Sequence, residues 1–223
     1  MLAFLAMPER PLFITFEGLD GSGKSTHLRR TAARLHERGI PHVVTHEPGG
    51  TPLGDAVRAI FLDPRWGTMD GTVELLLVFA SRRQHLLEVI EPALAAGKHV
   101  LCDRFTDSTL AYQGYGRGLP LPMIEQVDAL ATGGRRPDRT LLFDLPARTA
   151  RSRGDSPSRR SRGTADRLDA EGLAFYTRVR QGFLALAERE PERFRRVRSG
   201  GSPEGTWRQV SAIVEEWLGE TPP

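Results

Sequence analysis

One motif constrains the fold of this chain more than any other feature. Residues 18–25 read Gly-Leu-Asp-Gly-Ser-Gly-Lys-Ser and match the pattern G-x-x-x-x-G-K-[ST]. The apolar run Leu12–Phe16 precedes the motif, and Lys24–Glu37, of helical composition, follows it. A phosphate-binding loop requires this strand–loop–helix context, so the sequence predicts an α/β protein with the P-loop NTPase fold.

Each residue type in the loop has a physical reason. Glycines let the backbone curl until successive N–H groups point at phosphate oxygens, and the N-terminal end of the next helix adds a positive dipole. Lys24 is expected to reach the β- and γ-phosphates of ATP, and the Ser25 hydroxyl to ligate Mg²⁺. The expected ATP-binding residues are Gly18, Leu19, Asp20, Gly21, Ser22, Gly23, Lys24, Ser25 and Thr26.

Further strands and helices alternate along the chain, which predicts parallel strand pairing through βαβ units. The other expected strands are His42–Thr45, His99–Cys102, Thr140–Phe143 and Phe194–Val197. The expected helices are Lys24–Glu37, Leu53–Leu62, Val73–Ala96, Met123–Ala131, Leu173–Arg189 and Trp207–Leu218. Pro92 either bends the long helix or divides it into two.

Asp103 and Arg104 directly follow one of these strands. An acid at the C-terminal end of a parallel strand faces the ligand crevice, where Asp103 could hold Mg²⁺ or a water of its shell. Arg104 could bind a phosphate through two parallel hydrogen bonds. In isolation the two would be an ordinary surface pair, but beside a phosphate loop we interpret them as part of the site.

Composition narrows the class of protein. The chain has 223 residues and a formal net charge of +3, which suits an anionic ligand without requiring nucleic acid. Its single cysteine, Cys102, excludes a disulfide framework. The sequence has no apolar stretch of membrane-spanning length, and Met1–Met7 lacks the features of a signal peptide. We therefore expect a cytoplasmic protein with one kinase domain over residues 1–223, in which residues 1–10 are an N-terminal extension.

Five motifs occur in an order that resembles the bacterial thymidylate kinases. They are Phe16–Thr26, Glu47–Thr51, Asp103–Phe105, Ala111–Gly114 and Asp166–Arg167. The resemblance runs from about residue 11 to 218 and is more specific than the phosphate loop alone. It implies transfer of the γ-phosphoryl group of ATP to dTMP with Mg²⁺, giving dTDP for dTTP biosynthesis. It also implies a five-stranded parallel sheet flanked by helices, a flexible lid and a homodimer.

The resemblance implies roles for single residues. Asp20 is similar to the acid that contacts the dTMP sugar and orients an arginine, and Arg104 to the arginine that holds the dTMP phosphate. Arg82 resembles the helix arginine that reads the thymine edge. The implied substrate-binding residues are Asp20, Glu47, Pro48, Arg58, Phe79, Arg82, Arg104, Ser108, Thr109 and Gln113.

Two positions depart from the family pattern. His46 stands where members carry an arginine before Glu-Pro-Gly-Gly. Members also carry an aromatic residue four positions before the helix arginine, where this chain has Val78, with Phe79 beside it. Either Phe79 and Arg83 take over the two roles, or stacking on thymine is weaker, and Phe79 is then a core residue.

Residues 148–167 are rich in arginine and poor in apolar side chains, so we expect a mobile surface loop, which is either a solvated basic loop or the lid that the resemblance implies. The segment has no aromatic residue, which disfavours nucleic-acid binding. The phosphate loop has no arginine, and in this respect the chain resembles the thymidylate kinases that use lid arginines instead. The resemblance therefore implies that an arginine of this segment stabilises the transferring phosphoryl group, whose charge must be met by some donor. Arg153 matches the family position, with Arg159, Arg160 and Arg162 as alternatives. The expected catalytic residues are thus Lys24, Arg153, Asp20 and Arg104.

Two other functions remain compatible with the phosphate loop. One is a P-loop kinase for a different monophosphate or for a deoxynucleoside. The other is a P-loop ATPase that drives a partner. ADP release that depends on a monophosphate would exclude the ATPase, and a panel of acceptors would separate the kinases.

Overall fold

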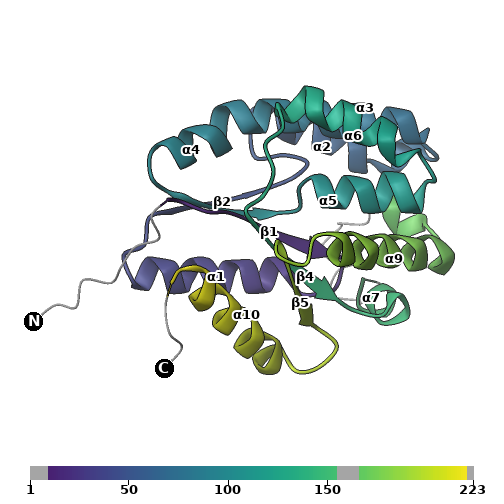
Figure 1. The fold of residues 1–223 in the computed structure, drawn as a ribbon. Helices are drawn as coiled ribbons and strands as arrows, with labels where there is room; N and C mark the ends of the chain where they lie inside the picture. Colours follow the sequence, from purple (N-terminus) through teal and green to yellow (C-terminus); the bar gives the residue numbers. More distant parts are fainter. Residues whose placement is uncertain (1–9, 155–165, 220–223) are drawn as a thin grey trace, which may run out of the picture.

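Five parallel strands form one sheet in the order β2-β3-β1-β4-β5. The computed structural model in Figure 1 describes residues 10–154 and 166–219. The strands are β1 Phe13–Gly18, β2 His42–His46, β3 His99–Asp103, β4 Arg139–Asp144 and β5 Phe194–Arg198. Each lies within one or two residues of its expected bounds, so the expected α/β fold with a five-stranded parallel sheet is confirmed.

Helices cover both faces of this sheet (Figure 1). The α-helices are α1 Lys24–Glu37, α2 Pro52–Leu62, α3 Gly71–His85, α4 Glu91–Ala95, α5 Thr106–Thr109, α6 Leu121–Thr132, α7 Ala147–Gly154, α9 Leu173–Arg189 and α10 Pro203–Trp217. Two 3-10 turns, η1 Pro64–Trp66 and η4 Arg167–Ala170, and two π-helical segments, η2 Leu86–Ile90 and η3 Leu110–Gly116, complete the described chain.

The alternating side chains of the central strand divide the core into layers. Ile14 and Phe16 on β1 pack with Leu28 of α1 and Val210 of α10, below the sheet in Figure 1. Phe13, on the opposite face, packs with residues of β3, η2 and α4. Because strand side chains alternate between faces, one apolar run buries both surfaces of β1, as a central parallel strand requires.

Three helical segments differ from the sequence expectation. The last helix begins at Pro203 and not at Trp207, because Ser202 caps it by accepting a hydrogen bond from the Gly205 N–H at 3.1 Å. The long helix starts at Gly71 and continues through π-helical η2 into α4. Pro92 is the second residue of α4, so the proline directly follows the π-helical segment. Residues 106–116, which had no assigned element, are helical.

The arginine-rich segment is not a surface loop throughout. Ala147–Gly154 forms α7, whose Ala147 and Ala150 are buried in the core beneath α9. Arg167 at the other end is only 5% exposed. The expectation of a loop without core contacts is therefore wrong at both ends, because small alanines three residues apart give α7 one apolar face. Arg159, Arg160 and Arg162 lie outside the described residues.

The N-terminal extension expected over residues 1–10 lies outside the described residues except for Arg10, which forms an ion pair with Asp138 at 2.7 Å. Within residues 10–154 and 166–219, no helix combines the length and the apolar character needed to cross a membrane.

Candidate active site

The phosphate loop connects β1 to α1 at the C-terminal edge of the sheet. Gly23 precedes the first helical residue with φ 92°, a left-handed conformation that favours glycine. Lys24 is 4% exposed, and its Nζ donates to the Leu19 carbonyl at 3.0 Å and lies 3.7 Å from Asp20 Oδ1. Burial, followed by the nearby Arg104 guanidinium, lowers the pKa of Lys24. An anionic phosphate in this loop would stabilise the ammonium form.

Ser25 and Asp103 meet across the sheet, since β3 is the parallel neighbour of β1. The Ser25 Oγ donates to Asp103 Oδ2 at 2.5 Å. A hydroxyl and a carboxylate are hard oxygen ligands of the kind that Mg²⁺ takes alongside water and phosphate oxygens. In the described part of the chain no three His, Cys, Asp or Glu side chains gather in a metal cage. The pair therefore fits Mg²⁺ held jointly with a nucleotide.

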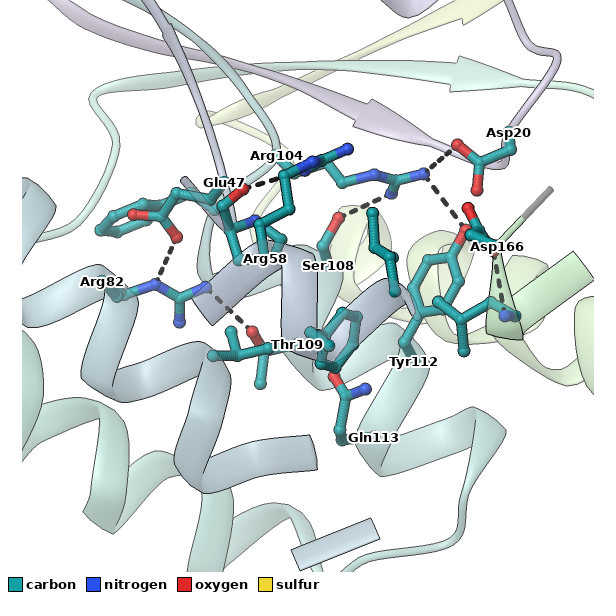
Figure 2. Close-up of a pocket in the computed structure, with 16 residues that line it drawn as sticks. Asp20, Glu47, Arg58, Arg82, Arg104, Ser108, Thr109, Tyr112, Gln113 and Asp166 are labelled. Carbon is teal, nitrogen blue, oxygen red and sulfur yellow. Dashed lines mark hydrogen bonds and ion pairs between the residues drawn. The ribbon is translucent and has the colours of Figure 1, made fainter. Parts of the chain in front are cut away.

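Two pockets adjoin at this edge of the sheet. The phosphate pocket contains loop residues, Asp103, His46 and Arg153. The acceptor pocket, drawn in Figure 2, extends away from the loop between α2, α3 and the helical segment 106–116. The residues that line both pockets are Asp20, Glu47, Arg58 and Arg104. A donor phosphate and an acceptor phosphate would meet at this shared wall.

Arg104 is the centre of the shared wall. Its Nη2 donates to Asp20 Oδ1 at 2.8 Å and to the Tyr112 hydroxyl at 3.2 Å, while Nη1 donates to Ser108 Oγ at 2.9 Å. Arg104 is the one residue other than glycine with positive φ, 74°, in residues 10–154 and 166–219. Such a backbone costs about 1–3 kcal/mol, and it persists only where the surroundings over-determine it.

Glu17 supplies part of that constraint. The carboxylate is fully buried and accepts the Phe105 N–H at 2.7 Å and the Ser108 hydroxyl at 2.5 Å. Glu17 thereby fixes the backbone of Phe105, which follows Arg104, and the hydroxyl of Ser108, which Arg104 contacts. Burial, with the nearby Asp107 carboxylate, raises the pKa of Glu17 to about 8. Glu17 and Tyr112 were missed as site residues from sequence, although an acid inside the apolar run that forms β1 was a usable signal.

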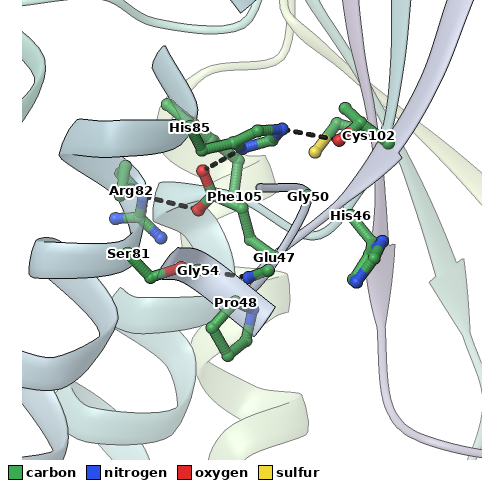
Figure 3. Close-up of polar contacts among 12 residues, drawn as sticks. His46, Glu47, Pro48, Gly50, Gly54, Ser81, Arg82, His85, Cys102 and Phe105 are labelled. Carbon is green, nitrogen blue, oxygen red and sulfur yellow. Dashed lines mark hydrogen bonds and ion pairs between the residues drawn. The ribbon is translucent and has the colours of Figure 1, made fainter. Parts of the chain in front are cut away.

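A second buried network holds Arg82, and Figure 3 shows Arg82 with its partner Glu47 and with His85. Arg82 is 1% exposed, and its Nε donates to Glu47 Oε2 at 2.7 Å. Its Nη2 donates to Thr109 Oγ1 at 2.9 Å. The other oxygen of Glu47 lies 2.9 Å from His85 Nδ1, and His85 Nε2 lies 2.6 Å from Thr45 Oγ1. His85 is fully buried and supports the site through Glu47.

The alternative left open at Val78 and Phe79 is resolved by the pocket. Val78 lines the acceptor pocket, whereas Phe79 is 3% exposed and belongs to the core behind it. The expectation that Phe79 contacts the substrate is therefore wrong, because one step along α3 turns the side chain by about 100°. The Arg82 guanidinium lies over the Phe79 ring at 4.8 Å from its centroid. Arg83 donates to the Ala131 carbonyl at 3.3 Å, outside the pocket.

The remaining expected residues divide between the two pockets. Pro48, Arg58, Ser108, Thr109 and Gln113 all line the acceptor pocket. Arg153 lines the phosphate pocket, where its Nη1 donates to the Ser199 carbonyl at 3.2 Å and lies 3.5 Å from the Gly21 carbonyl. His46 is half exposed, 3.5 Å from Asp55, and burial followed by the charge of Arg58 lowers its pKa.

Comparison with known proteins agrees with this geometry. A family model described as thymidylate kinase matches residues 16–209. The thymidylate kinase of Desulfovibrio desulfuricans is 49% identical over 210 residues, 93% of this chain and 96% of its own. That of Pseudomonas putida strain GB-1 is 49% identical over 203 residues, 91% and 94% of the two chains. A crystal structure of thymidylate kinase from Ehrlichia chaffeensis superposes with a TM-score of 0.72 at 33% identity, covering 92% of this chain and 99% of that one.

Proposed function

This chain belongs to the thymidylate kinase family, and we propose that its two adjoining pockets divide the reaction between ATP and dTMP. The chain is an ATP-dependent nucleoside monophosphate kinase, a transferase that phosphorylates dTMP to dTDP. The observation that carries the proposal is the wall of Asp20, Glu47, Arg58 and Arg104 that the two pockets share. Phosphoryl transfer needs its two anionic reactants held in line and close together, and this wall brings them together.

The phosphate pocket takes ATP in this proposal. Backbone N–H groups of residues 18–26 bind the phosphates, and Lys24 moves its ammonium from the Leu19 carbonyl to the β- and γ-phosphates. Ser25 and Asp103 would hold Mg²⁺, which supplies charge neutralisation of the phosphate oxygens when bound.

The acceptor pocket takes dTMP. Arg104 binds its phosphate, held in place by Asp20, while Arg58 adds a second guanidinium at the same wall. Arginine suits this task because its planar fork matches phosphate oxygens. The base lies deeper, against Val78, Arg82 and Gln113.

Arg153 is proposed to stabilise the transferring phosphoryl group. It is the arginine of α7 that lines the phosphate pocket, and its guanidinium lies 3.5 Å from the Gly21 carbonyl in a loop that has no arginine of its own. Charge that develops on the equatorial oxygens must be met by fixed donors, and a guanidinium at this place provides them.

A coupled assay of ADP release tests the function. Purified protein with ATP and Mg²⁺ should turn over with dTMP, more weakly with dUMP and poorly with purine monophosphates. Loss of one methyl contact costs only about 1–3 kcal/mol, so discrimination against dUMP should be modest. A higher kcat/KM for AMP or GMP than for dTMP would overturn the proposed acceptor.

We also propose a homodimer, formed by the helical layer of α2, α3 and α6. Its exposed apolar side chains are Leu53, Ile60, Val73, Leu76 and Leu130. These helices neighbour one another (Figure 1), so the side chains can form one apolar surface for a second copy. Sedimentation should give a dimer at micromolar concentration, and Leu76→Glu should shift it to monomer. A wild-type monomer would contradict this.

We also propose that the protein is a cytoplasmic kinase with one catalytic domain, and that it needs neither a membrane nor nucleic acid for turnover. Lys24, Arg58, Arg104 and Arg153 line the two pockets, and their positive charge suits the phosphates of small nucleotides. Addition of DNA or lipid vesicles should leave turnover unchanged, and a dependence of turnover on either would refute this part of the proposal.

A further inference from the structure

Glu74 is the most heavily bonded buried carboxylate near the acceptor pocket, yet it does not line that pocket. It lies in the first turn of α3 and is 0% exposed. Its Oε2 accepts from Gln113 Nε2 at 2.9 Å and from Arg117 Nε at 3.2 Å. Its Oε1 accepts from Arg117 Nη2 at 2.8 Å and from Arg167 Nη1 at 2.7 Å. Two segments that are distant from α3 in sequence, residues 113–117 and Arg167, therefore converge on one carboxylate.

The contact with Glu74 fixes which end of the Gln113 amide faces the ligand. The two ends of an amide are distinguished by their partners, and a carboxylate oxygen can only accept hydrogen bonds from an N–H. The amide nitrogen must therefore face Glu74. The amide oxygen is then turned toward the other residues of the pocket, as Figure 2 shows.

Arg82 provides hydrogen-bond donors in the same pocket. Its guanidinium has donors only, and it lines the same pocket while bonded to Glu47 and Thr109. The pocket thus presents an acceptor, Gln113 Oε1, and donors from Arg82. A pyrimidine with a 4-oxo group and a protonated N3 matches this pair. A 4-amino pyrimidine has an acceptor at N3 and donors at C4, so it opposes both.

We propose that Glu74 is a positioning residue that makes the pocket select 4-oxo over 4-amino pyrimidine monophosphates, by holding the Gln113 amide with its oxygen toward the base. The inference rests on the proposed function, since it assumes that the pyrimidine of dTMP occupies this pocket. The same carboxylate holds Arg167, whose Nε donates to the Phe61 carbonyl at 3.2 Å, and Phe61 is part of the pocket wall.

The test compares kcat/KM for dTMP and dCMP in wild type and Glu74→Gln. A neutral amide at position 74 can donate or accept a hydrogen bond. The Gln113 side-chain amide can then flip, which exchanges the positions of its oxygen and its nitrogen. The dTMP-to-dCMP ratio should fall about tenfold or more, because an opposed buried hydrogen bond is replaced by a matched one. Glu171→Gln is the control, since Glu171 pairs with Arg117 at 2.5 Å and does not contact Gln113. It should keep the wild-type ratio.

A variant that leaves two arginines near an uncharged residue could fail to fold. In that case Glu74→Gln is combined with Arg117→Met, which keeps the net charge of the cluster, and compared with Arg117→Met alone. Gln113→Met, which removes the amide, should also lower the ratio. An unchanged ratio in the folded Glu74→Gln protein, or in the double variant relative to its control, overturns the inference, as does an unchanged ratio in Gln113→Met. Wild type without activity on dTMP would instead refute the proposed function.

Discussion

Replacing Gly50 with alanine should damage the acceptor pocket from a position that does not line it. Gly50 has φ 81°, and a Cβ there would lie 2.6 Å from Thr45 Oγ1 and 2.7 Å from His85 Nε2. These two atoms are hydrogen bonded to each other at 2.6 Å. The methyl group would therefore push His85 away, and His85 in turn supports Glu47 (Figure 3).

The loss of stability expected for Gly50→Ala is the sum of a backbone cost and a cost of broken hydrogen bonds. A left-handed alanine costs about 1–2 kcal/mol, offset by about 0.4–1 kcal/mol because alanine has less conformational freedom than glycine in the unfolded chain. Breaking the contacts of His85 with Thr45 and Glu47 leaves buried polar groups without hydrogen-bond partners. The loss of these two contacts together should cost about 1–3 kcal/mol of stability. The free energy of unfolding should fall by about 1–5 kcal/mol in total.

Gly97 offers a matched control. It has φ 73°, and a Cβ there would meet nothing within 4 Å, so Gly97→Ala carries the backbone cost alone. Thermal melts should show a loss of about 2–4 °C in Tm for each kcal/mol in a chain of this size, and therefore a clearly larger loss for Gly50→Ala than for Gly97→Ala. The KM for dTMP should rise several-fold in Gly50→Ala only, because Glu47 no longer holds Arg82. Equal losses in Tm with an unchanged KM would refute the reasoning.

Three further predictions follow from the site. Lys24→Ala should lower kcat by about 10²–10³-fold or more with the fold intact, since a positioned charge is lost, and near-normal turnover would contradict the assigned role. Arg153→Ala should lower kcat far more than it raises the KM for dTMP, with partial rescue by lysine, because the contact strengthens in the transition state; an unchanged kcat would exclude Arg153 from the transfer step. Because burial raises the pKa of Glu17 from 4.5 to about 8, the folded protein binds more protons than the unfolded chain between these values, so the stability contributed by this group falls as pH rises through that window. Thermal melts should be recorded from pH 5 to 9, with the Tm of each protein expressed relative to its own value at pH 5. The wild-type Tm should fall over this range, and the Glu17→Gln variant should lack this fall. Identical pH profiles for the two proteins would contradict the prediction.

The sequence was informative wherever a function depends on contiguous residues. The phosphate loop could be predicted because its spacing, the strand before it and the helix after it all lie within residues 12–37. Asp103 and Arg104 were identified by the same logic, since the C-terminal ends of parallel strands meet at one edge. The start of α10 was also readable from Ser202-Pro203, a capping residue followed by proline, although the expected helix began at Trp207.

Side-chain orientation within a helix could not be decided from spacing alone. Val78 and Phe79 are adjacent and both apolar, and either one could face a ligand. Packing decided between them, because Phe79 fills the core beneath the Arg82 guanidinium and leaves Val78 toward the pocket. Arg167 likewise ends a polar segment in sequence but is buried against Glu74 in the fold.

By itself the sequence determined the succession of the strands and most of the helices along the chain, and the phosphate loop, because these depend on local conformational preference and on short motifs. Most residues of the acceptor pocket were identified through the resemblance to a family. Only the tertiary structure decided how buried charges are partnered. Glu17 meets Ser108 across 91 residues, and Glu74 meets Gln113 across 39. Such pairs have no signature in spacing, since a charged side chain is stable in the interior only if distant segments bring it hydrogen-bond partners.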